Sequence, residues 1–180
     1  MTLRKTAVFL SILAIIAIVL ILTGWFDPQP YGELAWKRPL SPIIVPARSE
    51  RVVWVNGVTG EVFSVRLTAV FDEGNPDSRY GLLIGDVADN LSITISPTGY
   101  AAIEQGGAVI VPYAPFPHVQ RDSVNEIWVD VDGDAVTVRL NRELFWQGEA
   151  DVDGGLGVLV ENFGEETAVV DFQTLALWRD

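Results

Sequence analysis

The chain has 180 residues, with 12 basic and 24 acidic side chains and a formal net charge of −12. All of the acidic residues lie after Phe26, so that part of the surface repels polyanions and we exclude nucleic-acid binding. The chain contains no cysteine, which excludes disulfides and thiol chemistry.

The first apolar run, residues 7–26, reads AVFLSILAIIAIVLILTGWF and contains no charged residue. As an α-helix it would be about 30 Å long, which matches the hydrocarbon core of a bilayer. A cleaved signal peptide is the alternative, but its apolar stretch is shorter and ends in an A-x-A pattern. We therefore predict an uncleaved signal-anchor, with residues 1–6 as a cytoplasmic tail and residues 7–26 as one transmembrane helix.

The orientation of this helix is predicted from the flanking charges. Arg4 and Lys5 favour an N-terminus inside the cell, although Lys37 and Arg38 beyond the helix weaken the asymmetry. The acidic composition of the remainder favours the outside. We predict a single-pass protein of the cell membrane with an extracytoplasmic C-terminal domain.

Residues 27–50 form a proline-rich segment, with prolines at 28, 30, 39, 42 and 46. Proline cannot continue a helix and favours extended chain. We predict a stiff spacer that separates the domain from the membrane. Its last part, PIIVPA, has the alternative of being an edge strand.

From residue 51 the apolar pattern has a period of two rather than 3.6. About ten short alternating segments are separated by turn sequences such as SPTG, QGG, DGD and NFGEE. Close spacing of this kind indicates an all-β sandwich or barrel over residues 51–180. A domain of that size buries enough apolar surface to fold without cross-links.

The segment EIWVDVDGDAVTVRL predicts a β-hairpin in which every cross-strand pair matches in polarity. Folded about Gly133-Asp134, it pairs valine with valine and isoleucine with leucine on one face: Val131 with Val136, Val129 with Val138, and Ile127 with Leu140. The other face pairs Asp130 with Thr137, Trp128 with Arg139, and Glu126 with Asn141. A turn on Asp132-Gly133 is the alternative.

The acidic residues of this hairpin allow two functional interpretations. A calcium loop is disfavoured because the glycine falls one position after the second aspartate and no helices flank it. A glycosidase is an alternative, because Glu126, Asp130 and Asp132 share a strand face with Trp128 and have about the carboxylate spacing such enzymes use. The favoured interpretation is a solvated strand face.

The order of three segments resembles the concanavalin A-like lectin/glucanase superfamily, specifically the laminin G-like and family-16-like modules of bacterial surface proteins. The segments are RYGLLIGDVADNLSITISPTGYAAIEQGG, VNEIWVDVDGDAVTVRLNREL and DVDGGLGVLVENFGEETAVVDFQTLAL. The similarity covers about Arg51 to Trp178 and implies a two-sheet antiparallel jelly roll. The E-x-D-x-(x)-E motif of the glucanases is missing, so the resemblance does not imply catalysis. Arg142 stands where many members have glycine, which puts the geometry of that turn in question.

The resemblance also implies a calcium site at the rim of the sandwich, as an alternative to having no cofactor. Its candidate ligands are Asp86, Asp89 and Asp132. We predict no catalytic residue.

Aromatic residues are the candidate binding residues: Trp128, Trp146, Tyr113 and Phe116. For Tyr113 and Phe116, which lie among three prolines, a core plug is the alternative to a binding tip. Either Phe145 or Trp146 is expected to face outward. Trp36 and Trp54 are ambiguous in the same way.

The sequence therefore predicts a membrane-anchored, non-catalytic binding module. It would recognise glycan or act as an accessory subunit of a membrane protein assembly, so the expected partners are the lipid bilayer, glycan and other membrane or extracytoplasmic proteins. A glycoside-cleaving enzyme of the same fold and a purely structural subunit are the alternatives.

Overall fold

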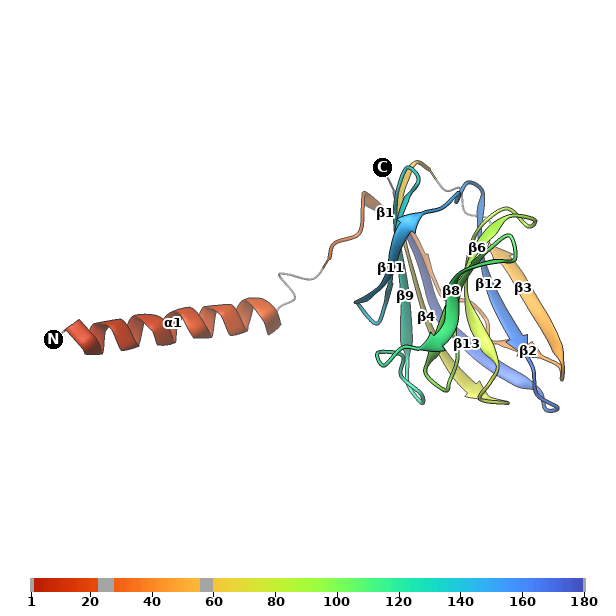
Figure 1. Ribbon diagram of the computed structural model, residues 1–180, viewed down its shortest axis with the longest axis horizontal. Helices are drawn as coiled ribbons and strands as arrows, with labels where there is room; N and C mark the ends of the chain where they lie inside the picture. Colours follow the sequence, from red (N-terminus) through yellow and green to blue (C-terminus); the bar gives the residue numbers. More distant parts are fainter. Residues whose placement is uncertain (1, 23–27, 56–59, 180) are drawn as a thin grey trace.

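The computed structural model describes residues 2–22, 28–55 and 60–179. Figure 1 shows one helix to the side of a β-sandwich, with the two sheets facing each other. The predicted all-β fold of two antiparallel sheets is confirmed.

Helix α1 spans Thr2–Leu22, and its apolar side chains between residues 9 and 19 are exposed. Residues 23–26 of the predicted membrane span lie outside the described part of the chain. In the described ranges, no helix is long and apolar enough to cross a membrane.

The first sheet has seven strands. Its path is β1 (Glu33–Arg38), β13 (Ala168–Arg179), β4 (Val62–Glu73), β9 (Asn125–Asp132), β10 (Ala135–Leu140) and β11 (Glu143–Glu149), and β2 (Ile43–Val45) also pairs with β13. The second sheet has six strands in the order β3 (Ser49–Val55), β12 (Gly155–Asn162), β5 (Arg79–Gly85), β6 (Asn90–Ile95), β7 (Tyr100–Gln105) and β8 (Ala108–Pro115). All pairs are antiparallel.

The proline-rich segment contributes strands to the sandwich. Within the predicted spacer, β1 pairs with the end of β13, β2 pairs with its beginning, and β3 starts at Ser49. The edge strand considered for PIIVPA is β2, where Ile43 and Val45 are buried while Ile44 points outward. The folded unit thus begins near Glu33 rather than at Arg51.

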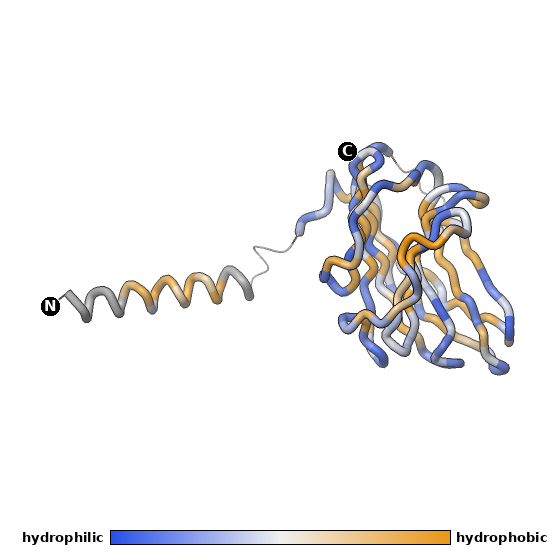
Figure 2. Tube along the Cα trace, in the orientation of Figure 1, coloured by the Kyte–Doolittle hydropathy of each residue, from blue (hydrophilic) through white to orange (hydrophobic). Residues whose placement is uncertain are grey.

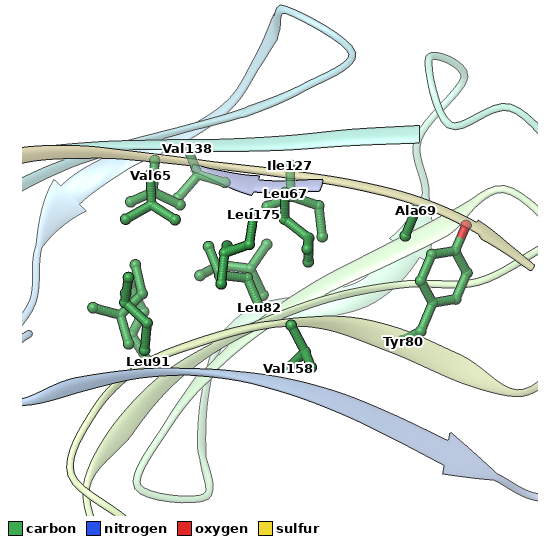
Figure 3. Packing of buried hydrophobic residues seen from close by; sticks show 14 of the residues in the cluster. Val65, Leu67, Ala69, Tyr80, Leu82, Leu91, Ile127, Val138, Val158 and Leu175 are labelled. Carbon is green, nitrogen blue, oxygen red and sulfur yellow. The ribbon is translucent and has the colours of Figure 1, made fainter. Parts of the chain in front are cut away.

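The core lies between the sheets, where apolar side chains from both inner faces meet. Figure 3 shows Val65, Leu67 and Ile127 of the first sheet pointing towards Leu82 and Val158 of the second. All of these are at most 2% exposed. The tube in Figure 2 shows hydrophobic colour concentrated along the strands and hydrophilic colour in the loops at both ends, as period-two burial requires.

The acidic hairpin has the predicted register. Val131 pairs with Val136, Val129 with Val138, and the turn consists of Gly133 and Asp134 between β9 and β10. The first turn residue, Gly133, has φ of 60°, a conformation that glycine adopts without strain.

The turn between β10 and β11 takes left-handed backbone without glycine. Asn141 has φ of 51° and Arg142 has φ of 73°, the two positive values of a type I′ hairpin turn. Asn141 is fixed there by its side chain, whose Oδ1 accepts from the Glu126 amide at 2.7 Å and whose Nδ2 donates to the Asn125 Oδ1 at 2.8 Å. The turn is therefore tight even though Arg142 stands where many members of the superfamily it resembles have glycine.

Candidate functional site

A groove of about 330 Å³ lies on the outer face of the six-stranded sheet. Leu83 of β5 and Leu159 of β12 point outward from the sandwich, yet they are only 4% and 8% exposed. Outward residues on a flat sheet would be open to water, so their burial shows that this face is hollowed. Polar and aromatic side chains surround them: Glu50, Trp54, Arg79, Asn90, Ser92, Thr94, Glu104 and Glu161.

Trp54 lines one end of the groove, and its indole lies against the backbone of β12. Trp54 pairs with Gly157 across the two strands. A Cβ on Gly157 would lie 3.0 Å from Cε3 and 3.3 Å from Cδ2 of Trp54, so only glycine leaves the ring this room. Glycine inside a strand often marks such a close approach. The ring is half-buried and lines the groove.

A row of charged residues crosses the sheet farther along the groove. Glu50 of β3 pairs with Glu161 of β12, and Glu161 pairs with Arg79 of β5. Arg79 Nε lies 3.0 Å from a carboxylate oxygen of Glu161, and its Nη1 lies 3.5 Å from one of Glu104. Arg79 thus holds two carboxylates in fixed positions on the groove surface.

Burial raises the pKa of Glu161 above its usual range. The guanidinium of Arg79 opposes this increase, while the negative charges of Glu104 and Glu50 add to it. Desolvation disfavours a carboxylate and an adjacent cation favours it, so the two effects compete at this position. The groove therefore contains a carboxyl group that a hydrogen-bonding or cationic ligand would stabilise in its ionised form.

A second hollow of about 410 Å³ adjoins the groove and shares Glu50 and Glu161 with it. Phe163 lines this hollow and is 51% exposed. The guanidinium of Arg79 lies 5.0 Å from the centre of the Phe163 ring and 5.5 Å from that of Tyr113. The combined surface therefore has an indole at one end, an exposed phenyl ring at the other, and carboxylates between them.

Tyr113, a predicted binding residue, lies near this surface. It is 42% exposed on β8 and stacks on Tyr100, with ring centres 5.1 Å apart and an interplanar angle of 24°. Its contact with Arg79 places it next to the charged row. Tyr113 thus belongs to the surroundings of the groove.

Trp128 lies on the opposite side of the molecule, on the outer face of the seven-stranded sheet, and is 1% exposed. Arg66 covers one part of its ring, with the guanidinium carbon 3.7 Å from the ring centre, and Arg139 lies 5.6 Å away. The ring has no free face for a ligand, so we remove Trp128 from the candidate site.

Asp130, one of the carboxylates considered for glycoside cleavage, is also buried. Its Oδ1 accepts from Ser64 Oγ at 2.5 Å and from the Trp128 indole at 2.6 Å, and Arg139 pairs with the other oxygen. With both oxygens engaged and 4% exposure, Asp130 fixes the strand face that carries it.

Phe116 and Trp146 pack against the core rather than standing on the surface. Phe116 meets Phe145 edge-on, with ring centres 5.0 Å apart. A bulge in the β10–β11 pairing between Val138 and Arg139 interrupts the alternation on the partner strand. Phe145 and Trp146 are therefore both half-buried against the core, and the expectation that one of them faces outward is wrong.

The three predicted calcium ligands do not gather at one point. Asp86 and Asp89 lie in the β5–β6 turn, whereas Asp132 ends β9 in the other sheet. Within the part of the chain that the structure describes, no three His, Cys, Asp or Glu side chains are placed to hold a metal ion. A calcium site at the rim stays a prediction.

The sequence reasoning missed Arg79, Glu161 and Phe163, and left Trp54 ambiguous. Two signals were available. Gly81 and Gly157 stand inside otherwise apolar strands, which indicates close approach of a neighbouring group. RYGLLIG and GLGVLVEN also carry charged residues on the same period-two face, which the pairing of the two strands brings together.

Comparisons with known proteins show the fold. No protein-family model and no curated protein matches the chain. Among solved structures, a carbohydrate binding module of Bacillus subtilis aligns with a TM-score of 0.56 and 13% identity over 79% of this chain and 94% of the module. A galectin of Caenorhabditis elegans aligns at 0.51 with 14% identity over 77% of this chain and 96% of the galectin.

A β-fructofuranosidase of Aspergillus kawachii aligns with a TM-score of 0.58 and 9% identity, over 81% of this chain and 27% of the enzyme. These similarities include binding proteins and an enzyme, and at such identities they carry no residue-by-residue correspondence. The sandwich of residues 33–179 has the concanavalin A-like jelly-roll fold.

Proposed function

We propose that this protein is a non-catalytic glycan-binding module whose ligand lies along the groove of the six-stranded sheet. The observation that carries the proposal is Trp54, packed against Gly157 in a groove that also presents carboxylate, hydroxyl and amide groups. A rigid aromatic surface packs against the apolar face of a sugar ring, while fixed carboxylates and hydroxyls accept and donate hydrogen bonds to sugar hydroxyls.

The rest of the groove supports this ligand class. Ser92, Thr94 and Asn90 on β6 add short hydroxyl and amide groups along its length. The aromatic rings of Trp54 and Phe163 lie far apart. Phe163 lines the second hollow together with Glu50, and Glu50 is already about 14 Å from Trp54 along β3 at the rise of an antiparallel strand. An elongated surface of this kind suits several linked sugars better than a single one. The similarity in fold to a carbohydrate binding module and a galectin also supports the proposal.

The test is binding of a panel of oligosaccharides to the full-length chain, measured by titration calorimetry. We expect Trp54→Ala to weaken binding at least about tenfold, since it removes a large buried contact. Trp178→Ala is the matched control, because Trp178 is half-buried on the outer face of the other sheet. Equal losses in the two variants, or retained binding in Trp54→Ala, would contradict the proposal.

Glycoside cleavage in the same groove is the second candidate function. The observation in its favour is Glu161, whose raised pKa is suited to a general acid and whose partner Arg79 also holds Glu104. Enzymatic activity would release new reducing ends from the bound oligosaccharide, and Glu161→Gln would abolish the release while leaving binding measurable.

An extracytoplasmic location, attachment to a membrane and a role as accessory subunit stay predictions. Fractionation of cells that express the full-length chain, with identification of proteins that co-purify, tests all three.

A further inference from the structure

The second hollow is lined by an aromatic residue that the core does not use. Phe163 is 51% exposed, more than any other Phe, Tyr or Trp in the described part of the sandwich, whereas Phe63 and Phe172 are fully buried. The guanidinium of Arg79 lies 5.0 Å from the centre of the Phe163 ring, yet half of the residue stays open to solvent. The ring is therefore available to a ligand in the hollow.

The chain on both sides of Phe163 is fixed in place. Asn162 is 2% exposed, and its Nδ2 donates hydrogen bonds to three backbone carbonyls. Its Oδ1 accepts from the Gly164 amide at 2.9 Å and from Ser78 Oγ at 3.2 Å. A Cβ on Gly164 would lie 2.4 Å from the Cβ of Asn75, so the loop packs closely against its neighbour. The exposed ring thus stands on a rigid base.

A second segment, distant in the sequence, lines the same hollow and is tied to this loop. Arg48 lines the hollow, its amide donates to the Gly164 carbonyl at 3.0 Å, and its side chain pairs with Glu165. Arg48 also has φ of 51°, a left-handed conformation that is strained for a residue with a Cβ. Such strain persists only where the surrounding structure imposes it. The hollow is therefore already formed without a ligand, as binding sites for small molecules usually are.

The lining of the hollow indicates the chemistry of its occupant. Besides the phenyl ring it consists of polar residues: Arg48, Ser49, Glu50, Glu161 and Asn162. A protein partner is recognised through a contiguous apolar patch, which a single ring does not provide. A sugar has an apolar ring face edged by hydroxyl groups, and it matches one aromatic ring surrounded by hydrogen-bonding groups.

We infer that the second hollow is a distal subsite of the glycan-binding groove, in which Phe163 packs against a sugar remote from the one on Trp54. This inference rests on the proposed function. Both hollows share Glu50 and Glu161, so a chain that leaves the groove enters the second hollow directly. The ligand class is then a linear chain long enough to contact both rings.

The length of the chain follows from the strand that connects the two rings. Gly157 lies beside Trp54, and Asn162 precedes Phe163. These two positions are separated by about 17 Å along β12 at the rise of an antiparallel strand. A disaccharide is shorter than this distance and a hexasaccharide is longer, so only the hexasaccharide reaches Phe163 when its other end lies on Trp54.

NMR titration of the full-length chain tests this arrangement. The probes are the disaccharide and the hexasaccharide of four linear series: cellulose, laminarin, xylan and mannan. We expect a hexasaccharide that binds to shift the signals of both the Trp54 indole N–H and the Gly164 amide. Its disaccharide should shift the Trp54 signal and leave that of Gly164 unchanged.

Titration calorimetry of three variants measures the contribution of the distal ring. Phe163→Ala should weaken hexasaccharide binding about tenfold, as the loss of one aromatic contact corresponds to, and leave disaccharide binding unchanged. Phe163→Tyr keeps the ring and should bind the hexasaccharide as the natural chain does. Leu144→Ala is the matched control, because Leu144 is 57% exposed on β11 of the other sheet, and it should change neither affinity.

The outcomes separate this inference from the proposed function. If sugars bind through Trp54 and Phe163→Ala leaves the hexasaccharide affinity unchanged, the distal subsite is wrong and the glycan-binding function stands. A loss in Phe163→Ala that is equal for disaccharide and hexasaccharide, or that Leu144→Ala reproduces, also overturns the distal subsite. If none of the probes binds, the inference and the proposed function fail together.

Discussion

Tyr80 buries a phenol in the core with one polar partner. Its ring is 1% exposed between Phe71 and Phe172, and its hydroxyl accepts a hydrogen bond from Asn125 Nδ2 at 3.1 Å. Burial raises the pKa of Tyr80 from 10.0 to about 12, although the Asn125 hydrogen bond opposes the increase. The neutral phenol is therefore part of the folded state.

This predicts an alkaline limit to stability. Because the folded pKa is raised, the contribution of Tyr80 is fully present below pH 10 and is lost as the pH rises towards 12, amounting to roughly 2–3 kcal/mol. Urea denaturation at a series of pH values, with Tyr80→Phe as the comparison, measures it. The variant should lose less stability over this interval than the natural chain. Identical pH profiles would contradict the assignment.

The Glu50–Glu161 pair makes a prediction that does not depend on any ligand. Glu50→Gln removes one of the negative charges that raise the pKa of Glu161, so this pKa should fall, although burial, the largest cause, remains. Carbon-detected NMR titration of the Glu161 carboxyl measures the change.

The same substitution should affect folding with a definite pH dependence. A carboxyl with a raised pKa favours the folded state in acid and loses that advantage as the pH rises through the folded pKa. Relief of the repulsion should therefore raise the free energy of unfolding at pH 7 by about 0.5 kcal/mol, with no gain in acid, where protonation of Glu161 has already removed the repulsion. An equal gain at both pH values would point to another cause.

At the scale of elements, the two hairpin turns that flank β10 both contain left-handed backbone, but different residue types adopt it. Gly133 has φ of 60° and a Cβ there would meet no atom within 4 Å, so backbone strain alone would oppose a side chain. Arg142 has φ of 73° although it carries a Cβ, so its backbone is strained. The cost of left-handed backbone for a residue with a Cβ is about 1–2 kcal/mol.

Reciprocal substitutions test this difference. Gly133→Ala should lower the free energy of unfolding by about 1 kcal/mol, and Arg142→Gly should raise it by about 0.5 kcal/mol after allowing for the greater freedom of glycine in the unfolded chain. Chemical denaturation of both variants measures the changes. A stabilising alanine at position 133 would show that the turn relaxes to another type.

The elements differ in how far the sequence predicted them. The β9–β10 register was predictable because the two strands are joined by two residues, and only one alignment matches every pair in polarity. Strand β1 was not predicted, and β2 was predicted only as an alternative to spacer, since the prolines around them indicate extended chain and their partner β13 lies more than a hundred residues away. The groove is lined by residues of β3, β5, β6, β7 and β12, which only the pairing of strands far apart in the sequence brings together.

At the scale of the whole molecule, the sandwich is closed by its N-terminal strands. Val45 is fully buried, Ile43 is 5% exposed, and each side chain contributes roughly 1.5–3 kcal/mol on burial. Asn162 Nδ2 donates to the carbonyls of Val45 at 3.1 Å and Pro46 at 2.9 Å, which ties the end of β12 to this segment. Trp36 of β1 also packs against the core.

A chain that begins at residue 51 should therefore be several kcal/mol less stable than one that begins at residue 28, because it exposes the edge of β13 and leaves the Asn162 amide without these acceptors. Thermal and urea denaturation of the two chains, side by side, measures the difference. A chain of residues 28–180 with Val45→Ala serves as the control, since it should lose only the part of the effect that comes from one apolar side chain. If the chain from residue 51 were as stable as the longer one, residues 28–50 would act as the spacer that their prolines indicate, and β1 and β2 would contribute nothing to the closure of the sandwich.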